Sequence, residues 1–341
     1  MNATAYRCSN DVIGLDIDMS DVKIDCIMLD LNKYVGTAIL CIGTVGHTLS
    51  ILVTALEPTL RSQSSGVYII ALSLTGLLAI YTGLLEHTIQ GYTAWEINIG
   101  YESKSNCIIH TILTYFSLQL ISWLQATIAL DRVFHVALPI WKPHFYSRRC
   151  RWKHGLLIVC VEAALALALN MFILYVVKYQ EKEKICDYSN NQIGQVWSAI
   201  DLVSFSLLPS IIIILCNVTI AAAVSRSRVH SENENENVEK TRRSLTIMLM
   251  VVNLIFLLTT VPVSIAQVIN MDSFSHSESI RFELARTVCI LIQYLGTACT
   301  FIIYCASGSK FRDIIKKWIM RAPVVQKIVE SRTTISLFEM T

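Results

Sequence analysis

Few residues of this 341-residue chain stand where they could carry out acid–base or nucleophilic chemistry. Seven long apolar stretches contain one Asp, Glu, Lys or Arg side chain between them, Glu162. None of these stretches holds a His, Asp and Glu cluster suited to a metal, or a nucleophile with an evident base. The sequence therefore predicts no catalytic, cofactor-binding or metal-binding residue, and it argues against an enzyme.

Two acidic positions remain of interest. Glu162 lies within an apolar stretch, where an acid is either functional or protonated and hydrogen-bonded to a neighbouring helix. We favour the second interpretation, because no Lys or Arg lies in the apolar stretches to pair with Glu162. Asp131 directly precedes Arg132 at the end of the third stretch, so this pair could form an ion pair. Alternatively, Arg132 extends to a membrane surface, as single arginines at helix ends usually do.

The seven apolar stretches are long enough to cross a bilayer, for which about 20 mostly apolar residues are needed. Charged residues make up 16% of the chain, whereas soluble domains carry about 25%. Backbone groups in lipid must be hydrogen-bonded within their own segment, so we expect helices. The sequence thus predicts an all-α membrane protein, a seven-transmembrane helix bundle, with spans at Val35–Leu56, Val67–Leu85, Cys107–Leu130, Gly155–Val177, Leu202–Val224, Leu245–Met271 and Thr287–Ser307.

Lys and Arg residues are divided unevenly between the two sides of these spans. Of the 28 in the chain, 19 fall on the side that carries Arg61, Arg132 and the C-terminal segment. Cytoplasmic loops carry such an excess. We therefore predict a multi-pass plasma-membrane protein with its N-terminus outside and its C-terminus in the cytoplasm. The sequon Asn2-Ala3-Thr4 then lies outside, and we expect Asn2 to be glycosylated.

The connecting segments have distinct compositions. We expect residues 1–32 to form an extracellular N-terminal segment and residues 33–307 the bundle. Residues 308–320 alternate apolar and basic side chains at helical spacing, which predicts a short amphipathic eighth helix on the membrane surface. Residues 321–341 follow as a cytoplasmic tail. Cysteines expected on the oxidising outer side permit three disulfide pairings; they are Cys8, Cys26, Cys107 and Cys186.

Several motifs, in order and spacing, resemble those of the rhodopsin-like (class A) G-protein-coupled receptor family over about residues 33–320. Asp131-Arg132-Val133 ends the third span and is followed by Pro139-Ile140. Cys107 lies 25 residues before Arg132. Further motif positions are Pro209 in span five, Phe256 and Pro262 in span six, Thr300–Tyr304 at the end of span seven, and Gly308–Arg312 after it.

The resemblance implies roles for these residues. It implies a disulfide between Cys107 and Cys186, which leaves Cys8 and Cys26 as a second pair. It also implies that Asp131 holds Arg132 at rest, and that activation frees Arg132 to contact a heterotrimeric G protein. The residues of this coupling switch are then Asp131, Arg132, Pro139, Ile140, Pro262 and Tyr304.

The chain also departs from the family pattern. His47 replaces an asparagine of span one and Gly76 replaces an aspartate of span two, so we expect the larger ring to fill the space that the missing side chain leaves. Without that carboxylate, a sodium ion has no counter-charge there. Thr259-Thr260 stands where a Cys-Trp pair is usual, and Arg242 where many members carry an acid that restrains the span-three arginine.

The resemblance further implies a ligand site in the outer third of the bundle, for which the candidates are Glu86, Thr114, Tyr115, Gln267, Gln293 and Tyr294. Thr114 stands where amine receptors carry an aspartate, which argues against a monoamine ligand. The segment Glu181–Cys186 predicts a hairpin-like outer loop, as in peptide-binding members. Ser244–Ile265 also resembles the sixth span of invertebrate receptors for amidated peptides.

We therefore expect a receptor whose partners are an extracellular ligand, most plausibly a neuropeptide, a heterotrimeric G protein and the lipid bilayer, with no nucleic acid. A chemosensory receptor for small molecules is the alternative from the same superfamily. A transporter or channel would call for paired charges near the membrane midplane or an internal repeat. The sequence offers neither.

Overall fold

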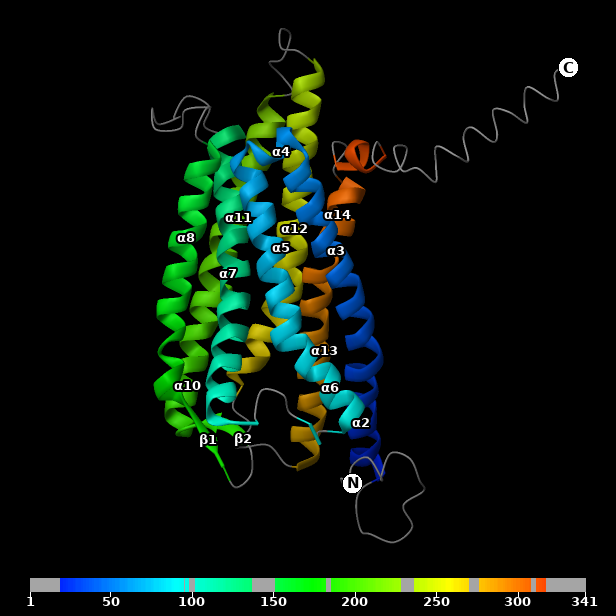
Figure 1. The fold of residues 1–341 in the computed structure, drawn as a ribbon, viewed down its shortest axis with the longest axis vertical. Coiled ribbons are helices and arrows are strands. Elements are labelled where there is room, and N and C mark those ends of the chain that lie inside the picture. Colours follow the sequence, from blue (N-terminus) through cyan, green and yellow to red (C-terminus); the bar gives the residue numbers. More distant parts are fainter. Residues whose placement is uncertain are drawn as a thin grey trace, which may run out of the picture.

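Seven helical spans run alongside one another down the long axis of the molecule (Figure 1). The structure, a computed structural model, describes residues 19–94, 96–97, 102–136, 151–181, 185–227, 236–269, 276–307 and 311–316. Within this part, six helices are long and apolar enough to cross a membrane, and a pair of helices bent by 48° forms the seventh. The predicted seven-transmembrane helix bundle is confirmed.

We number the spans in chain order, and several of them consist of consecutive helices. Span 1 is α2 (Met19–Asp30), η1 (Leu31–Val35) and α3 (Gly36–Leu56); span 2 is α5 (Ser64–Ala79), η2 (Ile80–Leu84) and α6 (Leu85–Thr93); span 3 is α7 (Lys104–Val136); span 4 is α8 (Arg151–Asn170) with α9 (Ile173–Val176); span 5 is α10 (Asn191–Asp201), η5 (Leu202–Leu207) and α11 (Leu208–Ser227); span 6 is α12 (Glu236–Val268); span 7 is α13 (His276–Ala298) and α14 (Thr300–Ser307). Helix α4 (Pro58–Arg61) joins spans 1 and 2, and strands β1 (Val177–Gln180) and β2 (Ile185–Tyr188) lie between spans 4 and 5.

Hydroxyl groups inside the spans find acceptors on their own helices. Thr44 and Thr75 each donate to the carbonyl oxygen four residues earlier, at 2.7 and 2.8 Å. Thr88 and Thr111 do the same at 2.9 and 2.8 Å. This bond satisfies the hydroxyl locally. Threonine can therefore occupy an apolar environment without a partner from another span.

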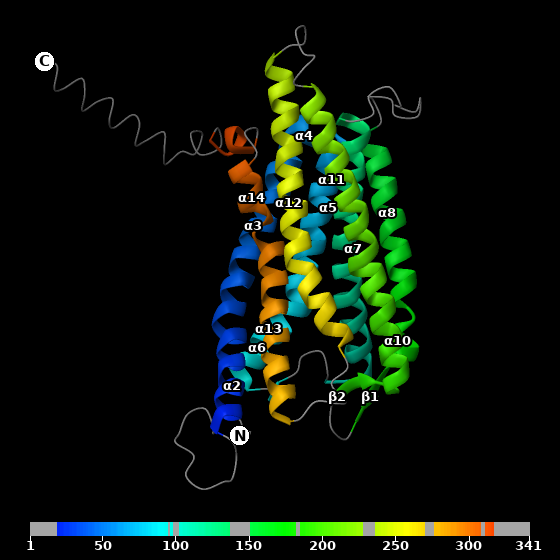
Figure 2. The same ribbon diagram turned by 180° about the vertical axis from the view of Figure 1, so that it is seen from behind.

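Spans 1 and 7 approach each other closely at two glycines. A methyl group on Gly43 would lie 3.1 Å from Cβ of Ala298, and one on Gly46 would lie 3.2 Å from the carbonyl oxygen of Ala298. This approach occurs beside the 48° bend between α13 and α14. Figure 2 shows α13 packed against α12 on its other side. Small residues on span 1 therefore allow the bent span 7 to fit into the bundle.

Every span begins earlier than the sequence predicted, and the difference is largest for spans 1, 5 and 7. Span 1 begins at Met19 rather than Val35, and span 5 begins at Asn191 rather than Leu202. The Asn190 side chain accepts a hydrogen bond from the Gln192 N–H at 3.0 Å, which marks the start of α10 as an N-cap does. Hydrophobicity alone misses such extensions, because helix ends beyond the apolar stretch carry polar residues.

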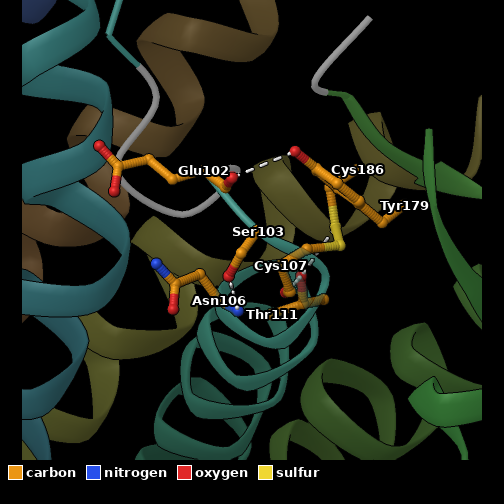
Figure 3. Close-up of a disulfide and its surroundings, with 7 residues drawn as sticks. All are labelled: Glu102, Ser103, Asn106, Cys107, Thr111, Tyr179 and Cys186. Atoms are coloured by element: carbon orange, nitrogen blue, oxygen red, sulfur yellow. Dashed lines mark hydrogen bonds between the residues drawn. A yellow bond between two sulfur atoms is a disulfide. The ribbon is translucent and has the colours of Figure 1, made fainter. Parts of the chain in front are cut away.

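The predicted hairpin between spans 4 and 5 is confirmed. Strands β1 and β2 pair in antiparallel register, with Tyr179 opposite Cys186. Cys186 forms a disulfide with Cys107 at the start of α7, with the two Cα atoms 5.8 Å apart (Figure 3). The implied Cys107–Cys186 pairing is therefore also confirmed. Cys26 is disulfide-bonded as well, but its expected partner Cys8 lies outside the described residues.

The disulfide rests on a small apolar core of its own. Cys107 and Trp197 are buried there, together with residues of α9. The Tyr179 hydroxyl donates to the Glu102 carbonyl oxygen at 3.3 Å, and the Thr111 hydroxyl lies 3.8 Å from the Cys186 sulfur (Figure 3). The hairpin is thus held to span 3 by a covalent bond and by packing.

We predict that Cys107→Ser and Cys186→Ser each reduce the amount of folded protein at the cell surface. A disulfide typically contributes about 2–4 kcal/mol by restricting the unfolded chain, and this one closes a separation of 79 residues. Surface labelling of intact cells measures the effect. The matched control is Cys41→Ser, since Cys41 is a free, exposed cysteine. Normal surface levels in both test variants would show that the bridge is dispensable.

Candidate functional site

Asp131 and Arg132 form a buried ion pair near one end of α7. Arg132 Nη2 lies 2.7 Å from Asp131 Oδ2, and the two side chains are 9% and 3% exposed. The Ser64 hydroxyl donates to Asp131 Oδ1 at 2.9 Å, and Arg132 Nη2 also donates to the Ser65 hydroxyl oxygen. Both serines begin α5. The pair is therefore tied to span 2 as well as to its own helix.

This geometry excludes the alternative interpretation of Arg132 as a side chain that extends to the membrane surface. Such an arginine would place its guanidinium in water, whereas Arg132 is buried against Asp131 and Ser65. Its Nε–H has no hydrogen-bond partner among the residues that the structure describes. A buried guanidinium with an unused donor is costly, so the arrangement can open if another acceptor is offered. That property suits a switch.

The remaining candidates for the switch lie at different places. Tyr304 is buried at the end of span 7, and its ring centroid lies 5.5 Å from that of Phe311. Pro262 lies within α12, which continues through it. Pro139 and Ile140 lie outside the described residues, as does Asn2 with its glycosylation sequon.

Residues 311–316 are helical and fold back onto span 7. Phe311 and Ile314 are buried, as the amphipathic pattern predicts. Arg312 Nη1 donates to the carbonyl oxygens of Cys305 and Ala306, at 3.3 and 2.7 Å. These carbonyls end α14, where basic side chains commonly satisfy unpaired acceptors. The sequence analysis missed this role of Arg312.

The expected packing of His47 against Gly76 is confirmed. The His47 ring is buried, and a methyl group on Gly76 would lie 2.5 Å from its Nε2 atom. The ring therefore occupies the space above Gly76. Nε2 has no hydrogen-bond partner within the described residues. Span 2 can accept the imidazole only because residue 76 has no side chain.

Glu162 is bonded as expected to a neighbouring helix. The Thr127 hydroxyl of α7 donates to Glu162 Oε1, while Oε2 has no partner within the described residues. Glu162 lies on span 4, whose most apolar segment is 17% buried inside the protein, against 61% for that of span 2. The contact links spans 3 and 4. It supports a structural role for this acid.

The six candidate ligand-site residues divide into separate groups. The Tyr294 phenol of span 7 lies over Gly83 of span 2, beside the methyl group of Thr114. Tyr115 faces the opposite way: its hydroxyl lies 3.3 Å from that of Tyr188 on the hairpin, and its ring packs against Trp197 of span 5.

The other three candidates lie on spans 2, 6 and 7. Glu86 is buried and accepts a hydrogen bond from Gln90 Nε2 at 3.1 Å. Gln293 is buried, and its backbone carbonyl oxygen accepts a bond from Thr297. Gln267 is half-buried near the end of α12. Among the six candidates, the described contacts place Tyr294 beside Thr114 and Tyr115 beside the hairpin.

A buried polar network escaped the sequence analysis. Asn170 Nδ2 donates to Gln119 Oε1 at 2.7 Å, and Gln119 Nε2 donates to Asp201 Oδ1 at 2.8 Å. All three side chains are buried, and they connect spans 4, 3 and 5. The predicted fifth span begins at Leu202, one residue after Asp201, so the sequence prediction places Glu162 alone among the acids inside a span. Residues 191–208 contain no proline and one glycine, Gly194. This composition was a usable signal that the helix of span 5 begins well before Asp201.

We predict that Gly76→Ala destabilises the protein, because the added methyl group would overlap the His47 ring. Overpacking of this kind typically costs about 1–3 kcal/mol. Thermal unfolding in detergent measures the change. In the His47→Ala background, Gly76→Ala should cost less stability than it does in the wild type, because the ring that it would overlap is absent. If the two substitutions are additive, the ring and the glycine do not constrain each other.

Comparison with known proteins gives one match. A family model described as "7 transmembrane receptor (rhodopsin family)" matches residues 46–304. The matched segment contains the last part of span 1, from Gly46 to Leu56, all of spans 2 to 6, and span 7 as far as Tyr304. A search of curated proteins finds no significant match.

Proposed function

Because the chain belongs to the rhodopsin family of seven-transmembrane receptors, it is a multi-pass membrane receptor that signals through G proteins, and we propose that its ligand is an extracellular peptide. Members of this family are receptors and not enzymes. The observation that carries the peptide proposal is the β1–β2 hairpin, which the Cys107–Cys186 disulfide holds at one end of the bundle.

The hairpin supports a peptide ligand through its shape and attachment. A two-stranded hairpin offers backbone groups and alternating side chains to an extended chain. Tyr188 at its end is 38% exposed, so the hairpin reaches the surface while staying attached to span 3. We place this end outside the cell, in keeping with the disulfide and the charge distribution. The N-terminus is then extracellular, and Asn2 is available for glycosylation.

Coupling would occur at the opposite end, where Arg132 lies. At rest Arg132 is held by Asp131 and by Ser65 of span 2. We propose that activation moves span 3 relative to span 2, breaks these contacts and exposes the guanidinium to a G-protein tail. Residues 308–320 would then lie along the inner membrane surface, and residues 321–341 would form a cytoplasmic tail.

A peptide-library screen tests the ligand class. Cells that express the receptor are exposed to amidated and free peptides, with calcium and cAMP readouts. We expect at least one peptide to activate wild-type receptor and to fail on Arg132→Ala at equal surface level. Activation by small odorants alone, with no peptide response, would instead support the chemosensory alternative.

We also predict measurable signalling without ligand. The sequence places Arg242, a like charge, where many members carry a restraining acid. A repulsion of about 1 kcal/mol between the two like charges would shift a two-state equilibrium up to about fivefold. Arg242→Glu should lower this activity, Ser65→Ala should raise it by freeing Arg132, and Arg132→Ala should abolish it.

The measurement is ligand-free G-protein activation, normalised to surface receptor. Ser62→Ala is the matched control for Ser65→Ala, because Ser62 is an exposed serine just before α5. A silent wild type, or a Ser65→Ala variant no more active than Ser62→Ala, would show that these contacts do not set the resting state.

A further inference from the structure

Asp201 is a buried carboxylate with little to balance its charge. The residue is 4% exposed, and among the described residues only the Gln119 amide donates to its carboxylate. No lysine or arginine in the described part of the chain forms an ion pair with it. Burying an ionised carboxylate is costly unless a cation or several donors compensate for lost hydration. Asp201 therefore has capacity for a further, preferably cationic, partner.

The hydrogen-bond network from Asn170 through Gln119 ends at Asp201. Asn170 donates to Gln119, and this bond fixes the direction of the Gln119 amide. Gln119 then donates to Asp201, so the two hydrogen bonds run in the same direction and end at the carboxylate. The carboxylate is the final acceptor of this series. The neutral Gln119 amide fixes the position of the carboxylate but does not neutralise a negative charge on it.

Aromatic rings lie next to this carboxylate. Tyr115 and Gln119 are four residues apart on α7, and Trp197 and Asp201 are four residues apart on α10, so each pair shares a helix face. The Tyr115 and Trp197 rings meet edge to face with centroids 5.6 Å apart. Phe172 stacks on the other side of Trp197, at 6.1 Å. Tyr115 and Trp197 thus form a contact adjacent to the Gln119–Asp201 bond.

The hairpin connects this group to the surface. Cys186 and Tyr188 are two residues apart on β2, so their side chains leave the same face of the strand. Cys186 is bonded to Cys107, and the Tyr188 hydroxyl lies 3.3 Å from that of Tyr115. Tyr188 is 38% exposed. A continuous row of aromatic side chains therefore leads from the exposed hairpin toward Asp201.

We propose that Asp201, together with Tyr115, Tyr188 and Trp197, forms a subsite for a positively charged group of the ligand, an ammonium or a guanidinium. The carboxylate supplies the counter-charge, and the aromatic rings attract a cation through their π faces. This inference rests on the proposed function, since it names the chemistry of the ligand. In a peptide the group would be a lysine, an arginine or a free N-terminus.

A charge-selective labelling experiment tests the subsite without an agonist. Tyr188→Cys places a thiol at the outer end of the aromatic row. Its thiolate attacks the sulfur of a methanethiosulfonate reagent, forms a mixed disulfide and releases methanesulfinate. The labelling rates of the trimethylammonium-ethyl and the sulfonato-ethyl reagents are compared on intact cells. We expect the cationic reagent to react faster, and Asp201→Asn to lower the ratio of the two rates about tenfold.

Matched variants separate the subsite from general effects. Gln180→Cys places the thiol on an exposed position of β1, away from Tyr115, and its rate ratio should not respond to Asp201→Asn. Asp201→Glu keeps the charge and should keep the ratio, which distinguishes loss of charge from misfolding. Receptor without an introduced cysteine gives the background.

The outcomes are distinct from those of the peptide screen. A rate ratio at Tyr188→Cys that Asp201→Asn leaves unchanged overturns the subsite, whatever ligand is found. An equal fall at Gln180→Cys also overturns it, because the effect would then belong to the whole outer surface. A fall confined to Tyr188→Cys supports the subsite even if no peptide activates the receptor, and it then indicates a small cationic ligand.

Discussion

Polar groups inside a membrane must find their partners within the protein, and this requirement shapes the structure at every level. Backbone groups are paired within helices, and threonine hydroxyls bond to their own helix, as Thr75 does. Some ionisable side chains also use a partner from a second span. Asp131 with Ser64 and Asp201 with Gln119 are examples, and each joins two spans. The contacts that satisfy charge are therefore also the contacts that position the spans.

The two ends of the bundle meet this requirement differently. At the hairpin end, a disulfide fixes the hairpin to span 3, and an apolar cluster around Trp197 supports it. At the opposite end, the contacts between Arg132 and span 2 are hydrogen bonds and an ion pair. Covalent attachment suits a ligand site that must keep its shape. Non-covalent contacts suit a switch that must open.

The centre of the bundle has an unusual composition for the family. The imidazole of His47 occupies the space over Gly76, where the family pattern places a carboxylate in span 2. With His47 and Gly76 in place of the asparagine and aspartate, the ring fills the space of the missing side chain, but the negative charge of the aspartate is lost. An acid does exist elsewhere in the bundle, at Asp201 on span 5.

The sequence by itself determined the spans, the family and the Cys107–Cys186 pairing. Hydrophobicity over about 20 residues depends only on neighbours in the chain, and the family motifs keep their spacing along it. The His47–Gly76 contact was also predictable, because the two departures from the family pattern are complementary in size. The limits of the spans were less accurate. Span 5 begins at Asn191, which the apolar stretch does not show.

Only the tertiary structure decided which polar residues meet. Ser65 is distant in sequence from Arg132, and Gln119 is distant from Asp201, yet each pair is in hydrogen-bond contact. Such contacts depend on how each helix is rotated and on how deep it lies relative to its neighbours. Those quantities follow from the packing of all spans together, as at Gly43, where span 1 meets span 7. No single segment contains that information, because a helix presents polar residues on a face whose partner is supplied by another span.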